Sequence, residues 1–174
     1  MDFSLSACCF TGHRPEKLPW GRNEADPRCR ALRLAMADSL AALYEAGCRR
    51  FLCGMAAGAD LLFGEAVVAL RDEHPDVYLH AAVPFQGQDR GWPEADRRRY
   101  RRLAEECDEV TVLHSAYTPG CMMERNRFMA DRSAYLIAAY DGRPGGTKNT
   151  IEYALSQGLT VLQLPMETGR DALQ

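Results

Sequence analysis

The chain has 174 residues, of which 47% are hydrophobic and 26% are charged. This composition is typical of a globular protein with a full core and argues against a disordered chain. The formal net charge of −3 argues against broad electrostatic capture of nucleic acid, because proteins that do this carry a basic surface. No apolar run approaches the length of a membrane span, and Met1–Ser4 lacks the features of a signal peptide, so we expect a cytoplasmic protein without membrane association.

The cysteines and histidines do not indicate a metal site. The seven cysteines contain no Cys-x-x-Cys pair, and the four histidines are scattered along the chain. We therefore expect reduced, buried thiols, no metal and no cofactor.

Strand patterns and helix patterns alternate along the chain. The first helix is predicted from the spacing of Leu32, Met36, Leu40 and Leu43, and Gly47 is its expected end. We expect strands at 6–10, 50–53, 77–83, 109–113, 134–140 and 160–164, and further helices at 60–74, 93–107, 121–132 and 150–157.

This alternation predicts one α/β domain over residues 1–174, a three-layer Rossmann-like fold with a mostly parallel sheet and helices on both faces. We expect the first strand to be central, with the second and third strands on one side and the later strands on the other. The polar tail from Glu167 is expected to fray.

A glycine turn joins the strand at 50–53 to the helix that follows it. Gly54 and Gly58 would let the backbone approach a ligand, and the free N–H groups of a helix start favour phosphate. A purely steric role for both glycines is the alternative. Asp60 either caps the helix or contacts a ribose or a base.

The other loops at the carboxyl ends of the strands carry polar and aromatic side chains. Ligands of parallel sheets bind beyond these ends, so we expect the loops at 11–15, 54–58, 85–92, 117–120 and 142–147 to converge on one pocket. Arg14 would clamp a phosphate or is a surface arginine near Glu16, and His13 is either a structural imidazole or a base. Phe85 and Trp92 would stack on a base, although packing of Trp92 on the following helix is the favoured alternative.

Three segments resemble the SLOG superfamily of Rossmann-like proteins, and in particular its uncharacterised YpsA-like branch. They are Thr11-Gly12-His13-Arg14-Pro15, the Tyr117-x-Pro-Gly loop leading to Arg125-Asn126-Arg127, and Gly146-Thr147-Lys148-Asn149-Thr150. The stretch 53–60 is also similar to the phosphate-binding turn of the DNA-processing protein A family. The resemblance is also compatible with a homodimer, because many proteins of this superfamily form dimers through their helices.

Two further stretches, 123–126 and 144–152, resemble the Met-x-x-Arg-Lys and Pro-Gly-Gly-x-Gly-Thr-x-x-Glu motifs of the LOG nucleosidases. That resemblance implies Arg125 and Glu152 as catalytic residues for cleavage of the N-glycosidic bond of a nucleoside monophosphate. The chain departs from the motifs where Asn126 replaces the lysine and where the Gly-Thr pair is interrupted, so the resemblance supports a pocket more strongly than a reaction.

Each of these residues also has a structural alternative. Glu152 follows Asn149 at the spacing of a capping box. Arg125 and Asn126 lie on the apolar stripe of their helix, where a guanidinium requires a phosphate or a carboxylate such as Asp60 or Asp131.

The sequence therefore predicts binding of a nucleotide or nucleotide-derived small molecule at the carboxyl ends of the strands, in the manner of a sensor. The alternatives are a LOG-like phosphoribohydrolase and a single-stranded DNA binder, for which the arginine-rich run at 97–102, otherwise a solvated surface, is the one local basic patch. The residues expected to bind the ligand are Gly12, His13, Arg14, Gly54, Met55, Ala56, Gly58, Asp60, Asn126, Gly145, Gly146, Thr147 and Thr150.

Overall fold

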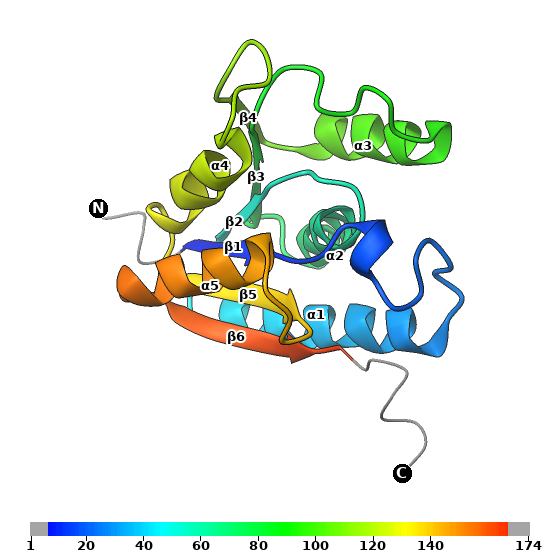
Figure 1. The fold of residues 1–174 in the computed structure, drawn as a ribbon. Helices are drawn as coiled ribbons and strands as arrows, with labels where there is room; N and C mark the ends of the chain where they lie inside the picture. Colours follow the sequence, from blue (N-terminus) through cyan, green and yellow to red (C-terminus); the bar gives the residue numbers. More distant parts are fainter. Residues whose placement is uncertain (1–6, 167–174) are drawn as a thin grey trace.

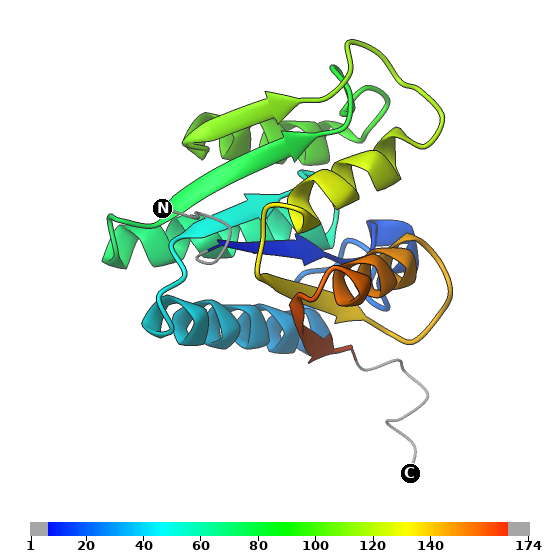
Figure 2. The same ribbon diagram turned by 90° about the vertical axis from the view of Figure 1, so that its left-hand side faces the viewer.

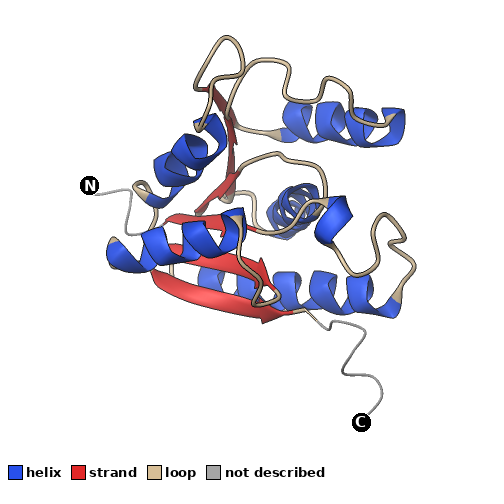
Figure 3. Cartoon of the chain, in the orientation of Figure 1, coloured by secondary structure: helices blue, strands red, loops and turns tan. Residues whose placement is uncertain are grey.

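The computed structural model describes residues 7–166 and contains a six-stranded sheet in which all neighbouring strands are parallel. The strand order is β4-β3-β2-β1-β5-β6. The strands are β1 (Ala7–Thr11), β2 (Arg50–Cys53), β3 (Tyr78–Val83), β4 (Glu109–Val112), β5 (Tyr135–Tyr140) and β6 (Thr160–Pro165). The Rossmann-like α/β class predicted from the alternating pattern is confirmed (Figure 3).

Helices cover both faces of the sheet, as Figures 1 and 2 show. The helices are α1 (Pro27–Glu45), α2 (Ala59–Glu73), α3 (Glu94–Glu106), α4 (Cys121–Ala130) and α5 (Gly146–Ser156), with a short 3₁₀ helix η2 (Pro15–Lys17) after β1. α1, α2 and α3 lie on one face and α4 and α5 on the other (Figure 2). No helix among the described residues has both the length and the hydrophobicity to cross a bilayer.

The core forms two layers because each central strand is buried on both faces. Along β1, Cys8 and Phe10 face α1 and α2, while Ala7 and Cys9 face α4 and α5. Phe10 stacks on Phe63 of α2 with ring centroids 4.6 Å apart. The predicted apolar face of α1 is confirmed, since its buried side chains include Leu32, Met36, Leu40 and Leu43.

The structure corrects the predicted position of the fourth strand. β4 lies beyond β3, on the same side of β1 as β2, and only β5 and β6 lie on the opposite side. The handedness of the crossovers explains this order. Because α3 shares a face with α1 and α2, a right-handed connection through α3 must continue in the same direction along the sheet, and the direction reverses when α4 crosses to the other face.

The structure also corrects the start of the last helix. α5 begins at Gly146 rather than Thr150, with Gly145 as its N-cap. Asn149 therefore lies inside the helix, and its N–H donates to the carbonyl of Gly145 at 3.0 Å. The capping-box interpretation of Asn149 and Glu152 is wrong, because Asn149 is not the residue that begins the helix. The predicted tail from Glu167 lies outside the described residues.

Candidate ligand-binding site

A pocket opens at the carboxyl ends of β1 and β5, the two strands between which the strand order reverses. Its volume is about 240 Å³, slightly below the roughly 300–1,000 Å³ of typical small-molecule sites. A reversal of strand order is the usual position for a ligand in an open parallel sheet. The pocket is lined by Phe10, Thr11, Gly12, His13, Arg14, Glu16, Lys17, Ala56, Asp60, Met122, Arg125, Asn126, Gly146 and Thr147.

Two cations at the pocket have no carboxylate partner among residues 7–166. Arg14 makes a contact of 3.7 Å from Nη2 to the sulfur of Met122, and Lys17 follows it by one turn of η2. The neighbouring Glu16 lies 3.6 Å from Arg22 instead, in an exposed ion pair. The loop after β1 therefore presents two positive charges to the pocket, and no carboxylate among residues 7–166 is in ion-pair contact with either.

The N-terminus of α5 lies beside these cations. Gly145 has a φ of 147° and forms the N-cap, and no side chain among the residues that the structure describes caps the helix. A Cβ at Gly145 would lie 3.2 Å from Nζ of Lys17, so the absence of a side chain lets the lysine approach the helix start. The first N–H groups of a helix lack intrahelical partners and carry the positive end of the helix dipole. The uncapped amides and the two cations together favour an anion at this end of the pocket.

His13 is held between two residues from the β5–α5 segment. Its Nε2 lies 3.1 Å from Oδ1 of the buried Asp141, an ion-pair distance without good hydrogen-bond alignment. Its Nδ1 lies 3.5 Å from the hydroxyl of Thr147. Arg143 anchors Asp141 through its backbone N–H at 3.0 Å and its Nε at 2.6 Å. Burial alone would raise the pKa of Asp141, but the hydrogen bonds from Arg143 together with His13 outweigh it and lower the pKa to about 2.

A chain of hydrogen bonds joins the β2 turn to the start of α5. Arg125 donates from Nη1 to the carbonyl of Gly54 and from Nε to Oδ1 of Asn126 at 2.8 Å. Asn126 donates in turn to the hydroxyl of Thr150 at 2.9 Å, and Thr150 donates to the carbonyl of Gly146 at 2.9 Å. These bonds fix the position of Arg125, which is only 5% exposed and lines the pocket.

The first N–H of α2, after the turn from β2, is bonded to the loop after β1. The N–H of Ala59 donates to the carbonyl of His13 at 3.0 Å, and a Cβ at Gly58 would lie 2.7 Å from that same carbonyl. Gly58 thus allows the loop after β1 to pack closely on the turn, in agreement with the steric alternative, and it does not line the pocket at β1 and β5. Its predicted phosphate contact stays a prediction. Gly58 itself is the N-cap of α2. The capping role of Asp60 is therefore wrong, and Asp60 accepts from the N–H of Ala56 at 3.2 Å.

The family model described as YspA SLOG matches residues 8–161. The chain belongs to this SLOG family. Its relatives include the "Uncharacterized SPbeta prophage-derived protein YoqJ" of Bacillus subtilis, 31% identical over 60% of this chain and 68% of that protein. A UPF0398 protein of Bacillus thuringiensis is 29% identical over 88% of this chain and 85% of the relative.

Solved structures of DNA processing protein A resemble this SLOG family member with a TM-score of 0.60. The Streptococcus pneumoniae protein is 20% identical, with 95% of this chain and 52% of that chain covered, so the present chain spans about half of it. The Helicobacter pylori protein, whose structure addresses single-stranded DNA binding, is 16% identical, with 97% of this chain and 68% of that chain covered. At these identities the likeness shows the fold alone.

Several predicted site residues of this SLOG family member lie outside the lining of the pocket. They are Gly54, Met55, Gly58, Gly145, Thr150 and Glu152. The Glu152 side chain is 62% exposed and lies 3.8 Å from Lys148, one helical turn away. The catalytic role of Arg125 and Glu152 stays a prediction, and the two side chains do not face the same pocket.

The loops at 85–92 and 117–120 do not reach the pocket either. Phe85 packs edge-on against Tyr117, and Trp92 packs edge-on against Tyr100 of α3 with ring centroids 5.6 Å apart. Both rings therefore pack against other side chains of the protein outside the pocket, which agrees with the packing alternative for Trp92.

The sequence analysis did not predict a role for two residues at or beside the pocket, Lys17 and Asp141. The sequence nevertheless contains a feature that points to each of them. Lys17 follows Arg14 by three residues, the spacing that aligns side chains on a 3₁₀ turn. Asp141 directly follows β5, at the edge where the other site residues gather.

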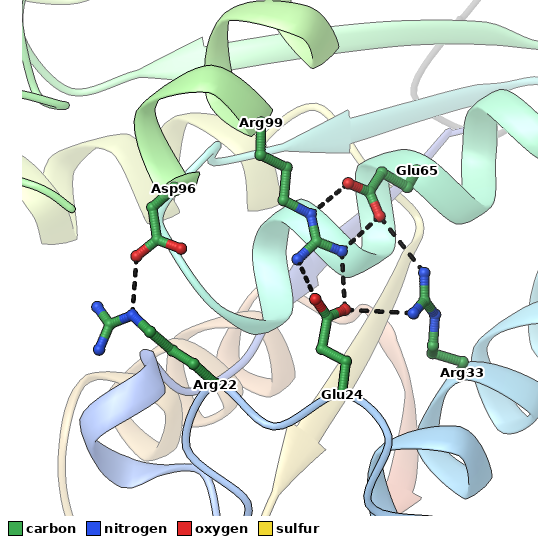
Figure 4. Close-up of polar contacts among 6 residues, drawn as sticks. All are labelled: Arg22, Glu24, Arg33, Glu65, Asp96 and Arg99. Atoms are coloured by element: carbon green, nitrogen blue, oxygen red, sulfur yellow. Dashed lines mark hydrogen bonds and ion pairs between the residues drawn. The ribbon is translucent and has the colours of Figure 1, made fainter. Parts of the chain in front are cut away.

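The arginine-rich run on α3 is largely neutralised by carboxylates. Arg99 bridges Glu24 and Glu65, as Figure 4 shows, and its Nη1 lies 2.6 Å from Glu24. Arg97 and Arg98 pair with other carboxylates of the α3 region. Arg99 is the exception to the mostly solvated surface predicted for this run, since it is half-buried and joins three segments of the fold.

Proposed function

We propose that this protein binds a nucleotide or a nucleotide-derived small molecule, with the phosphate at the N-terminus of α5. The observation that carries the proposal is the pair of cations, Arg14 and Lys17, left without a carboxylate partner among residues 7–166 beside an uncapped helix start. A phosphate would satisfy the free amides and balance both charges at once.

The proposal takes the form of binding, as in a sensor, rather than turnover. For the LOG-like reaction, the carboxylate implied by the motif would have to face the anomeric carbon of the sugar. Glu152, the residue implied by the LOG motif, is exposed and paired with Lys148 outside the pocket. A DNA-binding role is not favoured, because carboxylates neutralise most of the arginine-rich run.

Isothermal titration with nucleoside monophosphates and inorganic phosphate tests the proposal. We expect Lys17→Ala and Arg14→Ala each to weaken binding about 10-fold, the usual size of a lost charge-assisted hydrogen bond. Affinity for the wild-type protein should fall as salt is added, because the cations are accessible to solvent.

Lys148→Ala is the matched control. It removes the same charge from the first turn of α5, but Lys148 pairs with Glu152 and does not line the pocket. Absence of binding by the wild-type protein, or equal losses for the Lys17 and Lys148 variants, would contradict the proposed site.

A further inference from the structure

The part of the pocket beside Gly54, here called its inner end, contains a buried carboxylate beside a buried guanidinium. Asp60 is 6% exposed and Arg125 is 5% exposed, and both line the pocket. The two side chains meet over Gly54: a Cβ there would lie 2.6 Å from Nη1 of Arg125 and 2.9 Å from Oδ2 of Asp60. Glycine at position 54 thus leaves the space in which the two groups lie side by side.

Each group has polar atoms that no described residue satisfies. Asp60 accepts the Ala56 N–H with Oδ2, and no residue in 7–166 donates to Oδ1. Arg125 uses Nε and Nη1, and no residue in the same range accepts from Nη2. A polar atom that lines a pocket and has no protein partner is available to a ligand or to water. The inner end therefore offers one hydrogen-bond acceptor and one donor to whatever fills the pocket.

The surroundings of this pair favour an aliphatic polar group over an aromatic base. Phe10 is the one aromatic residue in the lining, and its ring is stacked on Phe63 and only 1% exposed. A base would find no free ring on which to stack there. Sugar hydroxyls both donate and accept, so they match a carboxylate oxygen next to a guanidinium N–H.

We propose that Asp60 and Arg125 bind the sugar hydroxyls of a ribose phosphate, the portion of a nucleotide nearest its phosphate. Asp60 accepts from one hydroxyl, and Arg125 donates to its neighbour. This inference rests on the proposed function, because it assumes that the phosphate lies at α5.

Calorimetry with two charge-matched probes tests the inference on the intact protein. Ribose 5-phosphate carries the hydroxyls, whereas methyl phosphate is a phosphomonoester without them. We expect the wild-type protein to bind ribose 5-phosphate about 10- to 100-fold more tightly than methyl phosphate, the range for hydrogen bonds to charged groups. In Asp60→Asn the ratio of the two affinities should fall, because asparagine keeps an oxygen for the Ala56 N–H but no longer offers a second acceptor to the sugar. The part of the preference that comes from Arg125 should remain.

The outcomes separate the two proposals. If the wild-type protein binds both probes with equal affinity, the sugar subsite is overturned and the phosphate site still stands. The same conclusion follows if Asp60→Asn leaves the ratio of the two affinities unchanged. If neither probe binds to the wild-type protein, both the phosphate site and the inference are overturned. The comparison of the two probes on the wild-type protein needs no substitution. It therefore tests the sugar subsite even if Asp60→Asn does not fold.

Discussion

Gly58→Ala is expected to destabilise the protein because the residue combines an unfavourable backbone conformation with close backbone neighbours. Its φ is +94°, and an added Cβ would lie 2.7 Å from the His13 carbonyl, 2.9 Å from Cδ of Pro15 and 3.0 Å from Cα of Arg14. An L-residue in the left-handed region costs about 1–2 kcal/mol. Overpacking against atoms that cannot rotate away adds about 1–3 kcal/mol. The free energy of unfolding should therefore fall by about 2–5 kcal/mol.

Gly47→Ala is the matched control for this substitution. Gly47 has a φ of +98°, but an added Cβ would have no atom within 4 Å. Its loss should be limited to the conformational part, about 1–2 kcal/mol. Urea unfolding followed by circular dichroism measures both variants. Equal losses would refute the reasoning, since they would mean that the loop after β1 does not pack on Gly58 as the structure shows.

Two further predictions concern electrostatics. Arg99→Ala should lower the free energy of unfolding by about 1–3 kcal/mol, because two half-buried carboxylates lose their shared partner, whereas the exposed pair lost in Arg98→Ala is worth at most about 0.5 kcal/mol. Similar losses in urea unfolding of the two variants would contradict the bridging role. For Asp141, folding lowers the pKa from 3.8 to about 2, so its carboxylate stabilises the fold fully above about pH 4 and this contribution is lost as the pH falls toward 2. The difference in free energy of unfolding between wild type and Asp141→Asn should therefore be constant at higher pH and shrink below about pH 4. A difference that does not change with pH down to pH 2.5 would show that folding does not lower the pKa of Asp141.

Much of the architecture follows from local sequence patterns. The spacing of Leu32, Met36, Leu40 and Leu43 predicts α1, and the apolar run at 134–140 predicts a strand buried on both faces. These patterns are informative because helix and strand periodicity decide which side chains share a face whatever the neighbouring element is. The strand order was only partly predictable, since the position of β4 depends on which face α3 packs against.

Of the two glycine turns, the sequence could not say which one leaves its helix start free. Gly54–Gly58 and Gly145–Gly146 each lead from a strand into a helix, and each looks suited to phosphate. In the structure, the carbonyl of His13 takes the first N–H of α2, whereas the start of α5 remains uncapped beside Lys17.

The sequence by itself determined the elements, the parallel sheet and the edge at which polar loops gather, because these depend on periodicities within short segments. Only the tertiary structure decided which polar groups face one another. Arg125 reaches Gly54 across 71 residues of sequence and His13 reaches Thr147 across 134, while Glu152, one turn beyond Lys148, turns to solvent. Contacts between side chains so distant in the chain arise from packing of helices on the sheet, and no local pattern encodes them.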